Sequence, residues 1–289
     1  MKKTSKAIKI IINLRNILIN IPIQILCIFY SLVVLIPVSW AIVSSIRDSI
    51  SFFKNPFGIP AIIQLSNFSE AWKNENVAIY FRNSLFMTAV SVFFIILLSA
   101  LASYALTRLK FVGRINILIL FVSGLFVPSA LLLLPLFILL NQIHLLGSLL
   151  GLILVYIAYS FCFTIFVLVP FFNMIPRELE EAAFIDGATH FQVFWRIIIP
   201  LARPGLILAT IFNIFGIWNE LILAWTLISE DSRKTLPVGL ANILVRQNYS
   251  ANYGILFAAV TIAIAPIVIL YIVFQRRLIG GLMAGALKE

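Results

Sequence analysis

Charged residues are scarce in this sequence. Lys, Arg, Asp and Glu make up 11% of its 289 residues, whereas a soluble domain carries roughly a quarter. Hydrophobic residues reach 62%, which is more than a folded chain can bury away from water. The shortage of charge therefore excludes a soluble globular fold, and we expect the chain to lie in a lipid bilayer.

Several motifs that carry chemistry are also missing. There is no G-x-x-x-x-G-K-[ST] phosphate loop, no H-E-x-x-H, and no Cys or His pair at metal-binding spacing. Cys27 and Cys162 fall in separate apolar runs and indicate no disulfide framework. We therefore predict that the chain is not an enzyme and has no catalytic residue, no metal site and no cofactor of its own. Any energy for uphill transport would come from another chain.

Long apolar runs are what the sequence has in abundance. Six of these runs have about the 20 residues that a membrane helix needs. They are 21–45, 85–106, 115–140, 149–172, 206–228 and 255–274. They should be helices, because lipid offers no hydrogen bonds to backbone groups. Pro37, Pro128, Pro135 and Pro266 fall inside these runs and should kink them, which we interpret as packing geometry in preference to gating.

The basic residues divide unevenly between the two sides of such a bundle. With six spans both termini lie on one side, and that side holds 14 of the 21 Lys and Arg residues. The other side, which includes segments 49–80 and 230–253, holds 7. By the positive-inside rule the basic side is cytoplasmic. The net charge of +10 is thus an orientation signal and does not indicate nucleic-acid binding.

The densest acidic run lies between the fourth and fifth spans. Glu178, Glu180 and Glu181 follow Pro176, a residue suited to the first turn of a helix, whose positive end favours carboxylates. Gly187 is a natural left-handed stop for that helix. The whole link is about thirty residues long, far more than a usual connection between helices. We predict a folded element here and not a simple loop.

A second short helix should follow the glycine. Thr189 and Gln192 have the T-x-x-Q spacing of a capping box. An apolar face at helical spacing comes next, and Pro200 should end the helix. The face consists of Phe191, Phe194, Trp195 and Ile198. The pattern alone fits either an idle interfacial helix pair or a partner-docking element, and small residues such as Ala182 and Ala183 favour docking.

The same link resembles the EAA loop of ABC-importer permeases, whose pattern is E-A-A, three residues, Gly, and nine or more residues before I-x-x-P. The matching residues are Glu181, Ala182, Ala183, Asp186, Gly187, Ala188, Ile197 and Pro200. The stretches YFRNSL, WNEL, KTLPVGL and FQRRLIGGLMAGALKE resemble, in order, the carbohydrate-uptake branch of that family. In layout the chain is similar to the smaller maltose-type permeases.

The resemblance implies an all-α integral membrane protein with the type I ABC importer permease fold: six transmembrane helices and a cytoplasmic EAA coupling-helix loop at about 173–205. The implied domains are 1–77 (cytoplasmic N-terminus, first helix, external loop), 78–275 (permease core) and 276–289 (cytoplasmic tail). The tail resembles segments that reach the ATPase interface, and a frayed end is an equal alternative.

The resemblance also implies partners in a bacterial cell membrane. They are a second homologous permease, two ATPase subunits that use the ATP, and an extracytoplasmic solute-binding protein that delivers a carbohydrate. An amino-acid or oxyanion permease is the alternative within the family. Two alternatives lie outside the family. A secondary carrier would favour several ionisable groups within the spans, whereas a membrane scaffold without transport activity would need none.

Glu220 is the one acid that falls inside a predicted span, next to Trp218 and Asn219. A carboxylate in lipid is costly, so it should face a cavity or another helix. In one interpretation these three residues line the translocation path, and the Trp218 ring stacks on a sugar. In the other, which we favour, Glu220 is a structural tie to another helix. Asn83 and Ser84, at the mouth of the second span, pose the same choice, and there we expect a helix cap.

Overall fold

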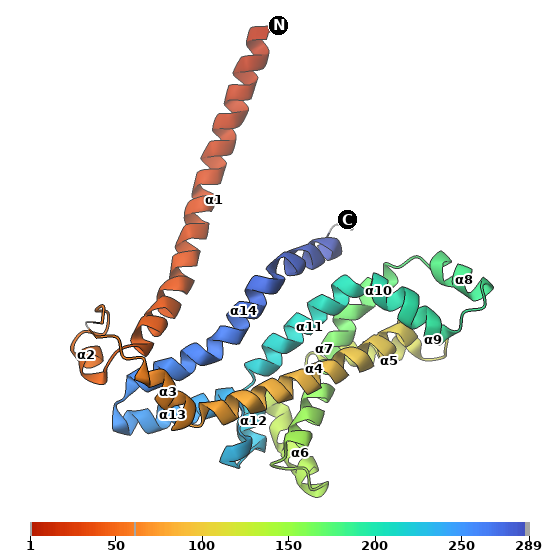
Figure 1. Cartoon of the computed structure of the whole chain (residues 1–289). Helices are drawn as coiled ribbons and strands as arrows, with labels where there is room; N and C mark the ends of the chain where they lie inside the picture. The colour runs from red at the N-terminus through yellow and green to blue at the C-terminus, as the bar shows by residue number, and fades with distance from the viewer. Residues whose placement is uncertain (1, 61, 287–289) are drawn as a thin grey trace.

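The computed structural model describes residues 2–60 and 62–286, and for 2–20, 248–250 and 276–286 it describes the backbone alone. The regular elements of these residues are helices (Figure 1). The predicted cytoplasmic tail at 276–289 thus lies outside the residues whose side chains are described.

Four helices are long and apolar enough to cross a bilayer alone. They are α1 (Lys2–Ser45), α4 (Val77–Arg108), α7 (Leu149–Asn173) and α14 (Tyr253–Ala286). Two bent pairs of helices can each supply one further crossing, which brings the total to 6. The expected all-α membrane fold with six spans agrees with this arrangement.

The third predicted span, 115–140, is not one straight helix. α5 (Arg114–Gly124) and α6 (Ser129–Gln142) form a bent pair with an angle of 102° between them. Pro128 stands directly before α6 in an extended conformation, because its ring and its missing N–H do not let a helix run through it from the preceding turn. Pro37, Pro135 and Pro266 instead lie within helices that continue past them.

The fifth predicted span, 206–228, is also interrupted. α11 (Arg203–Trp218) makes an angle of 75° with the preceding segment His190–Leu201, and it ends well before residue 228. A separate short helix, α12 (Ile222–Leu227), follows. The prediction of one continuous helix is wrong here because the carboxylate of Glu220 binds backbone amides of α12 and starts a new helix.

Short helices gather at the two ends of the bundle (Figure 1). The α8 end contains α8 (Glu178–Ile185), α9 (His190–Val193), the π-helical η1 (Phe194–Ile198) and α10 (Ile199–Leu201). The α13 end contains α2 (Ser49–Lys54), α3 (Ser66–Lys73), the 3-10 helix η2 (Asp231–Arg233) and α13 (Leu236–Ser250). Because α4 and α7 run between the two ends, each end can be fastened to the same helices.

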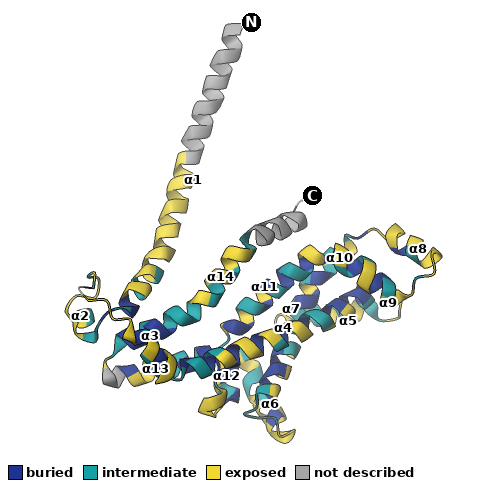
Figure 2. Ribbon diagram, viewed as in Figure 1, coloured by how far each residue is buried: buried dark blue, intermediate teal, exposed yellow. Residues whose placement is uncertain are grey.

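α4 is the central helix of the core. Its Ile95 belongs to a buried cluster with α7 and α12, its Tyr80 to one with α13 and α14, and its Ala100 to one with α7 and η1. By contrast, the apolar side chains of α1 between Ile21 and Ile36 are exposed (Figure 2). That surface suits lipid or another chain.

Candidate functional site

α8 forms where the acidic run predicted a helix. Its first turn holds Glu178, Glu180 and Glu181, at the end where the helix dipole stabilises carboxylates. Gly187 follows with φ +83°, the left-handed conformation that the sequence predicts. A Cβ atom at this glycine would meet nothing within 4 Å, so the backbone angle and not the available space selects glycine.

The second helix begins with the predicted capping box. The backbone N–H of Gln192 donates to Thr189 Oγ1 (3.3 Å), and the N–H of Thr189 donates to Gln192 Oε1 (2.8 Å). The helix then widens into the π-helical η1 and continues through Pro200 to Leu201. The helix thus ends one residue after Pro200, close to the predicted end.

The apolar face predicted on this helix is divided. Phe194 and Ile198 are buried in the cluster below α4 and α7. Phe191 and Trp195 are 69% and 42% exposed, and their rings meet 6.1 Å apart. The prediction of one continuous apolar face is thus wrong, because the space between α4 and α7 accommodates only Phe194 and Ile198.

α8 presents opposite faces to the bundle and away from it. With about 100° between successive helical residues, Glu180, Ala183 and Phe184 share the inward face. Glu180 is buried, and Phe184 packs against the His190 ring, with centroids 4.7 Å apart. The outward face holds Glu181, Ala182 and Ile185, all exposed. Of the other EAA-pattern residues, Asp186, Gly187 and Pro200 are exposed, whereas Ala183 and Ala188 are half-buried.

The anchor of α8 is a buried ion pair that the sequence reasoning missed. Arg108 Nε lies 2.9 Å from Glu180 Oε1, and the two side chains are 5% and 7% exposed. Burial raises the pKa of Glu180, and the nearby Arg108 and Arg177 oppose that rise. The available signal was an arginine just beyond the second predicted span, on the same side as the acidic run.

Trp218, Asn219 and Glu220 stand at the break between α11 and α12 and point to different partners. Glu220 accepts hydrogen bonds from the N–H groups of Leu223 (2.8 Å) and Ala224 (3.0 Å) and from the Tyr156 hydroxyl (3.0 Å). The buried Trp218 indole donates to the Ala263 carbonyl of α14 (3.1 Å).

Asn219 is exposed, and its amide donates to the Phe215 carbonyl one turn back in its own helix (2.9 Å). The structure therefore ties Glu220 to α7 and Trp218 to α14. Trp218 and Asn219 share a hollow of about 200 Å³ between α11, α13 and α14, and Glu220 does not line it.

We expected Asn83 and Ser84 to cap their own helix. They do not, because α4 begins earlier, at Val77. The Asn83 amide donates to the carbonyls of Ser232 (2.9 Å) and Lys234 (3.0 Å). Ser84 Oγ accepts from the N–H of Leu236, the first residue of α13 (2.7 Å). Both side chains hold the segment between α12 and α13.

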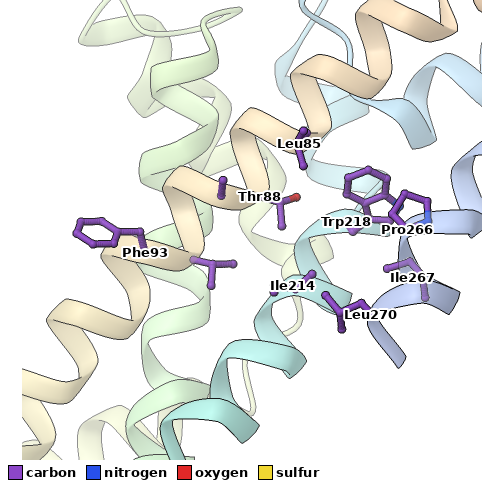
Figure 3. Close-up of a pocket in the computed structure, with 10 residues that line it drawn as sticks. Leu85, Thr88, Phe93, Ile214, Trp218, Pro266, Ile267 and Leu270 are labelled. Carbon is purple, nitrogen blue, oxygen red and sulfur yellow. The ribbon is translucent and has the colours of Figure 1, made fainter. Parts of the chain in front are cut away.

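Further hollows open between the spans. An apolar one of about 410 Å³ lies between α4, α11 and α14, and its lining includes Leu85, Thr88, Trp218 and Pro266 (Figure 3). A more polar one of about 350 Å³ lies between α5, α7 and α11. Sequence reasoning missed the polar hollow, because its residues come from three separate spans.

The lining of the polar hollow combines rings with hydrogen-bonding groups. Tyr159, Phe163 and Phe212 supply the rings, and Ser160 and Asn213 supply polar atoms. The Asn213 amide donates to Thr164 Oγ1 (2.9 Å) and to the Ala209 carbonyl (2.8 Å), which fixes its orientation. Such a mixture suits a solute with apolar faces and a polar rim.

Residues 95–282 match the family described as binding-protein-dependent transport system inner membrane component. The chain is 35% identical to the diacetylchitobiose uptake system permease protein NgcG of Streptomyces coelicolor, over 91% of this chain and 87% of the relative. It is 34% identical to the sulfoquinovosyl glycerol transport system permease protein SmoH of Agrobacterium fabrum, over 88% and 89%.

A solved structure has a similar fold. It is a chain of a bacterial ABC transporter involved in the import of the acidic polysaccharide alginate. The TM-score is 0.78 at 23% identity, over 90% of this chain and 96% of that chain.

Proposed function

The chain belongs to the family of binding-protein-dependent transport system inner membrane components, the permease subunits of ABC importers, and we propose that its solute is a carbohydrate. It is accordingly a multi-pass membrane transport subunit and not an enzyme. Family membership implies an ATPase and a solute-binding protein as partners. Our proposal extends this to a complex with a second homologous permease and two ATPase subunits, which bind and hydrolyse the ATP.

The polar hollow is the observation that carries the carbohydrate proposal. A sugar ring has apolar faces for Tyr159, Phe163 and Phe212 and hydroxyls for Ser160 and Asn213. The names of the two relatives each contain a glycoside, which supports the same class. We place the translocation path along this hollow. Trp218 and Glu220 then serve as structural ties, in keeping with their contacts to α14 and α7, whereas Asn219 binds only its own helix.

The outward face of α8 is the proposed ATPase-docking surface. Glu181, Ala182 and Ile185 are exposed there, and the alanine permits close approach of a partner backbone. This places the α8 end in the cytoplasm and the α13 end outside, facing the solute-binding protein, and the 14-to-7 division of basic residues supports that orientation. A cysteine introduced at Lys234 should accordingly react only with a reagent added from outside, and labelling only from inside would contradict the orientation.

Co-purification with the ATPase subunits tests the docking role. Gly187→Val places a β-branched residue at φ +83°, a strained conformation that costs roughly 1–3 kcal/mol. Ala183 lies where α8 packs on the bundle, so its expected place on the docking face is wrong, and Ala183→Trp should act by displacing the outward face. Both variants should insert in the membrane and lose the ATPase. Gly187→Asn is the matched control, because asparagine tolerates the left-handed region. Native ATPase binding in Gly187→Val and Ala183→Trp would leave α8 as an interfacial helix only.

Ligand screening of the solute-binding protein, followed by uptake in proteoliposomes, tests the carbohydrate assignment. Asn213→Leu removes the oriented amide of the polar hollow and should lower uptake of the identified sugar. Thr88→Val is its control, since it changes the apolar hollow by a similarly small volume. Equal loss in both variants would argue against a path along the polar hollow.

A further inference from the structure

α8 is joined to the bundle mainly through one buried side chain. Among its residues Glu180 alone is buried, and Ala183 is half-buried. α8 follows α7 directly through residues 174–177, but the chain after α8 reaches α11 only through the left-handed Gly187, the π-helical η1 and the bend between Leu201 and Arg203. No short covalent route therefore leads from α8 to α4.

Arg108 offers a shorter route. It is the last residue of α4, and its Nε pairs with Glu180 Oε1 at 2.9 Å. Its Nη2 donates to the carbonyls of Phe172 (2.5 Å) and Ile175 (2.7 Å), at the end of α7. One guanidinium thus contacts α4, α7 and α8 together. Carbonyls at a helix end lack partners within their own helix, and a cation is favoured there.

We propose that Arg108 is the positioning residue that joins α8 to α4 and α7, so that movement of a docked ATPase reaches these two spans directly. The inference rests on the proposed docking of α8. It also divides the roles of two adjacent acids: Glu181 faces the partner, whereas Glu180 faces Arg108.

The geometry requires an arginine. Its planar fork reaches two carbonyls and one carboxylate at once, whereas the ammonium of lysine is a compact donor that cannot span the same three acceptors. Exchanging the two residues, as Arg108→Glu with Glu180→Arg, should not restore the joint. The new carboxylate would face the Phe172 and Ile175 carbonyls, which need a donor.

Distance measurements between spin labels test the joint without a sugar. The labels replace Leu179 on α8 and Leu101 on α4, both exposed, in a chain whose Cys27 and Cys162 are changed to alanine. The complete complex in nanodiscs is compared without nucleotide and with ATP plus vanadate. With Arg108 present, the distance distribution should stay unchanged between the two states. With Arg108→Gln it should shift and broaden, and with Arg108→Lys it should broaden less.

Arg114→Gln serves as the control, because Arg114 begins α5 and its loss removes a basic charge from the same end of the bundle. It should keep the native distances. If Arg108→Gln does not assemble, Glu180→Gln replaces it, since the amide keeps the size and shape of the side chain but lacks the charge.

Two results would overturn the proposal. One is native distances in both states for an assembled Arg108→Gln or Glu180→Gln complex. The other is a nucleotide-dependent change between the labels in the native chain. Failure of the native chain to retain the ATPase would instead refute the proposed function, so the two are distinguishable.

Discussion

The two ends of the bundle are held in different ways, although α4 fastens both. At the α13 end, Tyr80 donates to Asp231 (2.8 Å), Asn83 binds two carbonyls, and Ser84 accepts from the first amide of α13. Gly239 also lies against Tyr80 so closely that a Cβ atom would stand 2.1 Å from the ring. At the α8 end, a single buried ion pair holds a helix whose outward face is exposed.

The two ends differ in how much surface they leave exposed to a partner. Several hydrogen bonds along one helix, one of them to the Asp231 carboxylate, fix the segment between α12 and α13 in both position and register. The ion pair between Arg108 and Glu180 fixes the distance of α8 from the bundle and leaves its outward face to a partner. A buried arginine occurs at each end: Arg47 binds the carbonyls of Ser51, Asn55 and Pro56, whereas Arg108 also binds an acid.

Breaking the Arg108–Glu180 ion pair should have the largest effect on stability. Arg108→Leu leaves the Glu180 carboxylate buried without its cation, which should lower the free energy of unfolding by about 3–5 kcal/mol. Steric trapping in bicelles measures this. The double variant Arg108→Leu with Glu180→Leu should recover much of the loss, because no buried charge remains. Equal destabilisation in the single and double variants would show that packing, and not charge, makes Arg108 important.

Loosening the α13 end should cost less. Asn83→Leu leaves the Ser232 and Lys234 carbonyls without their donor, a loss of roughly 1–3 kcal/mol. Hydrogen exchange should rise in the segment between α12 and α13 and stay native in α8. Ser84→Ala, which removes one acceptor only, should have a smaller effect in the same segment. A rise that spreads to both ends would mean that the two ends are not independent.

The tie inside the membrane sharpens the comparison further. Glu220→Leu removes the acceptor of the Leu223 and Ala224 N–H groups in the first turn of α12 and the partner of Tyr156. The loss should cost about 1–2 kcal/mol and lower uptake or assembly with the second permease. Tyr156→Phe, which loses one of these contacts, is the matched control and should cost less. Full uptake and normal assembly in Glu220→Leu would show that this tie is dispensable.

The smallest effect should come from pH at the α13 end. Hydrogen bonds from Lys234 and Tyr80 hold the pKa of Asp231 below its usual range, while burial opposes them. A lowered pKa in the folded state means stability that is present above the unfolded value of about 3.9 and is lost as the pH falls through the folded value.

Because the Asp231 side chain is half exposed, the loss should be a few tenths of a kcal/mol. Exchange protection of residues near η2, corrected for the intrinsic rate, checks this on acidification. Lys234→Gln should reduce the pH response, and an unchanged response would assign it to other groups.

Local features of this chain were predictable from the sequence. The apolar runs had to be helices, since lipid leaves backbone groups no other partners. The left-handed Gly187 and the Thr189–Gln192 capping box also agree with the structure. Each depends on residues within one or two turns of each other. The orientation of the termini and the domain boundaries stay predictions.

Only the tertiary structure decided which polar groups meet across the bundle. Arg108 and Glu180 belong to different helices, Asn83 and Ser232 are 149 positions apart, and Glu220 meets Tyr156 across 64. The interruption after Trp218 was hidden as well, because the run 206–228 is apolar almost throughout. Hydropathy determines that a segment crosses the membrane. Where a buried charge finds its partner depends on how the helices pack, and packing brings together residues that no local pattern connects.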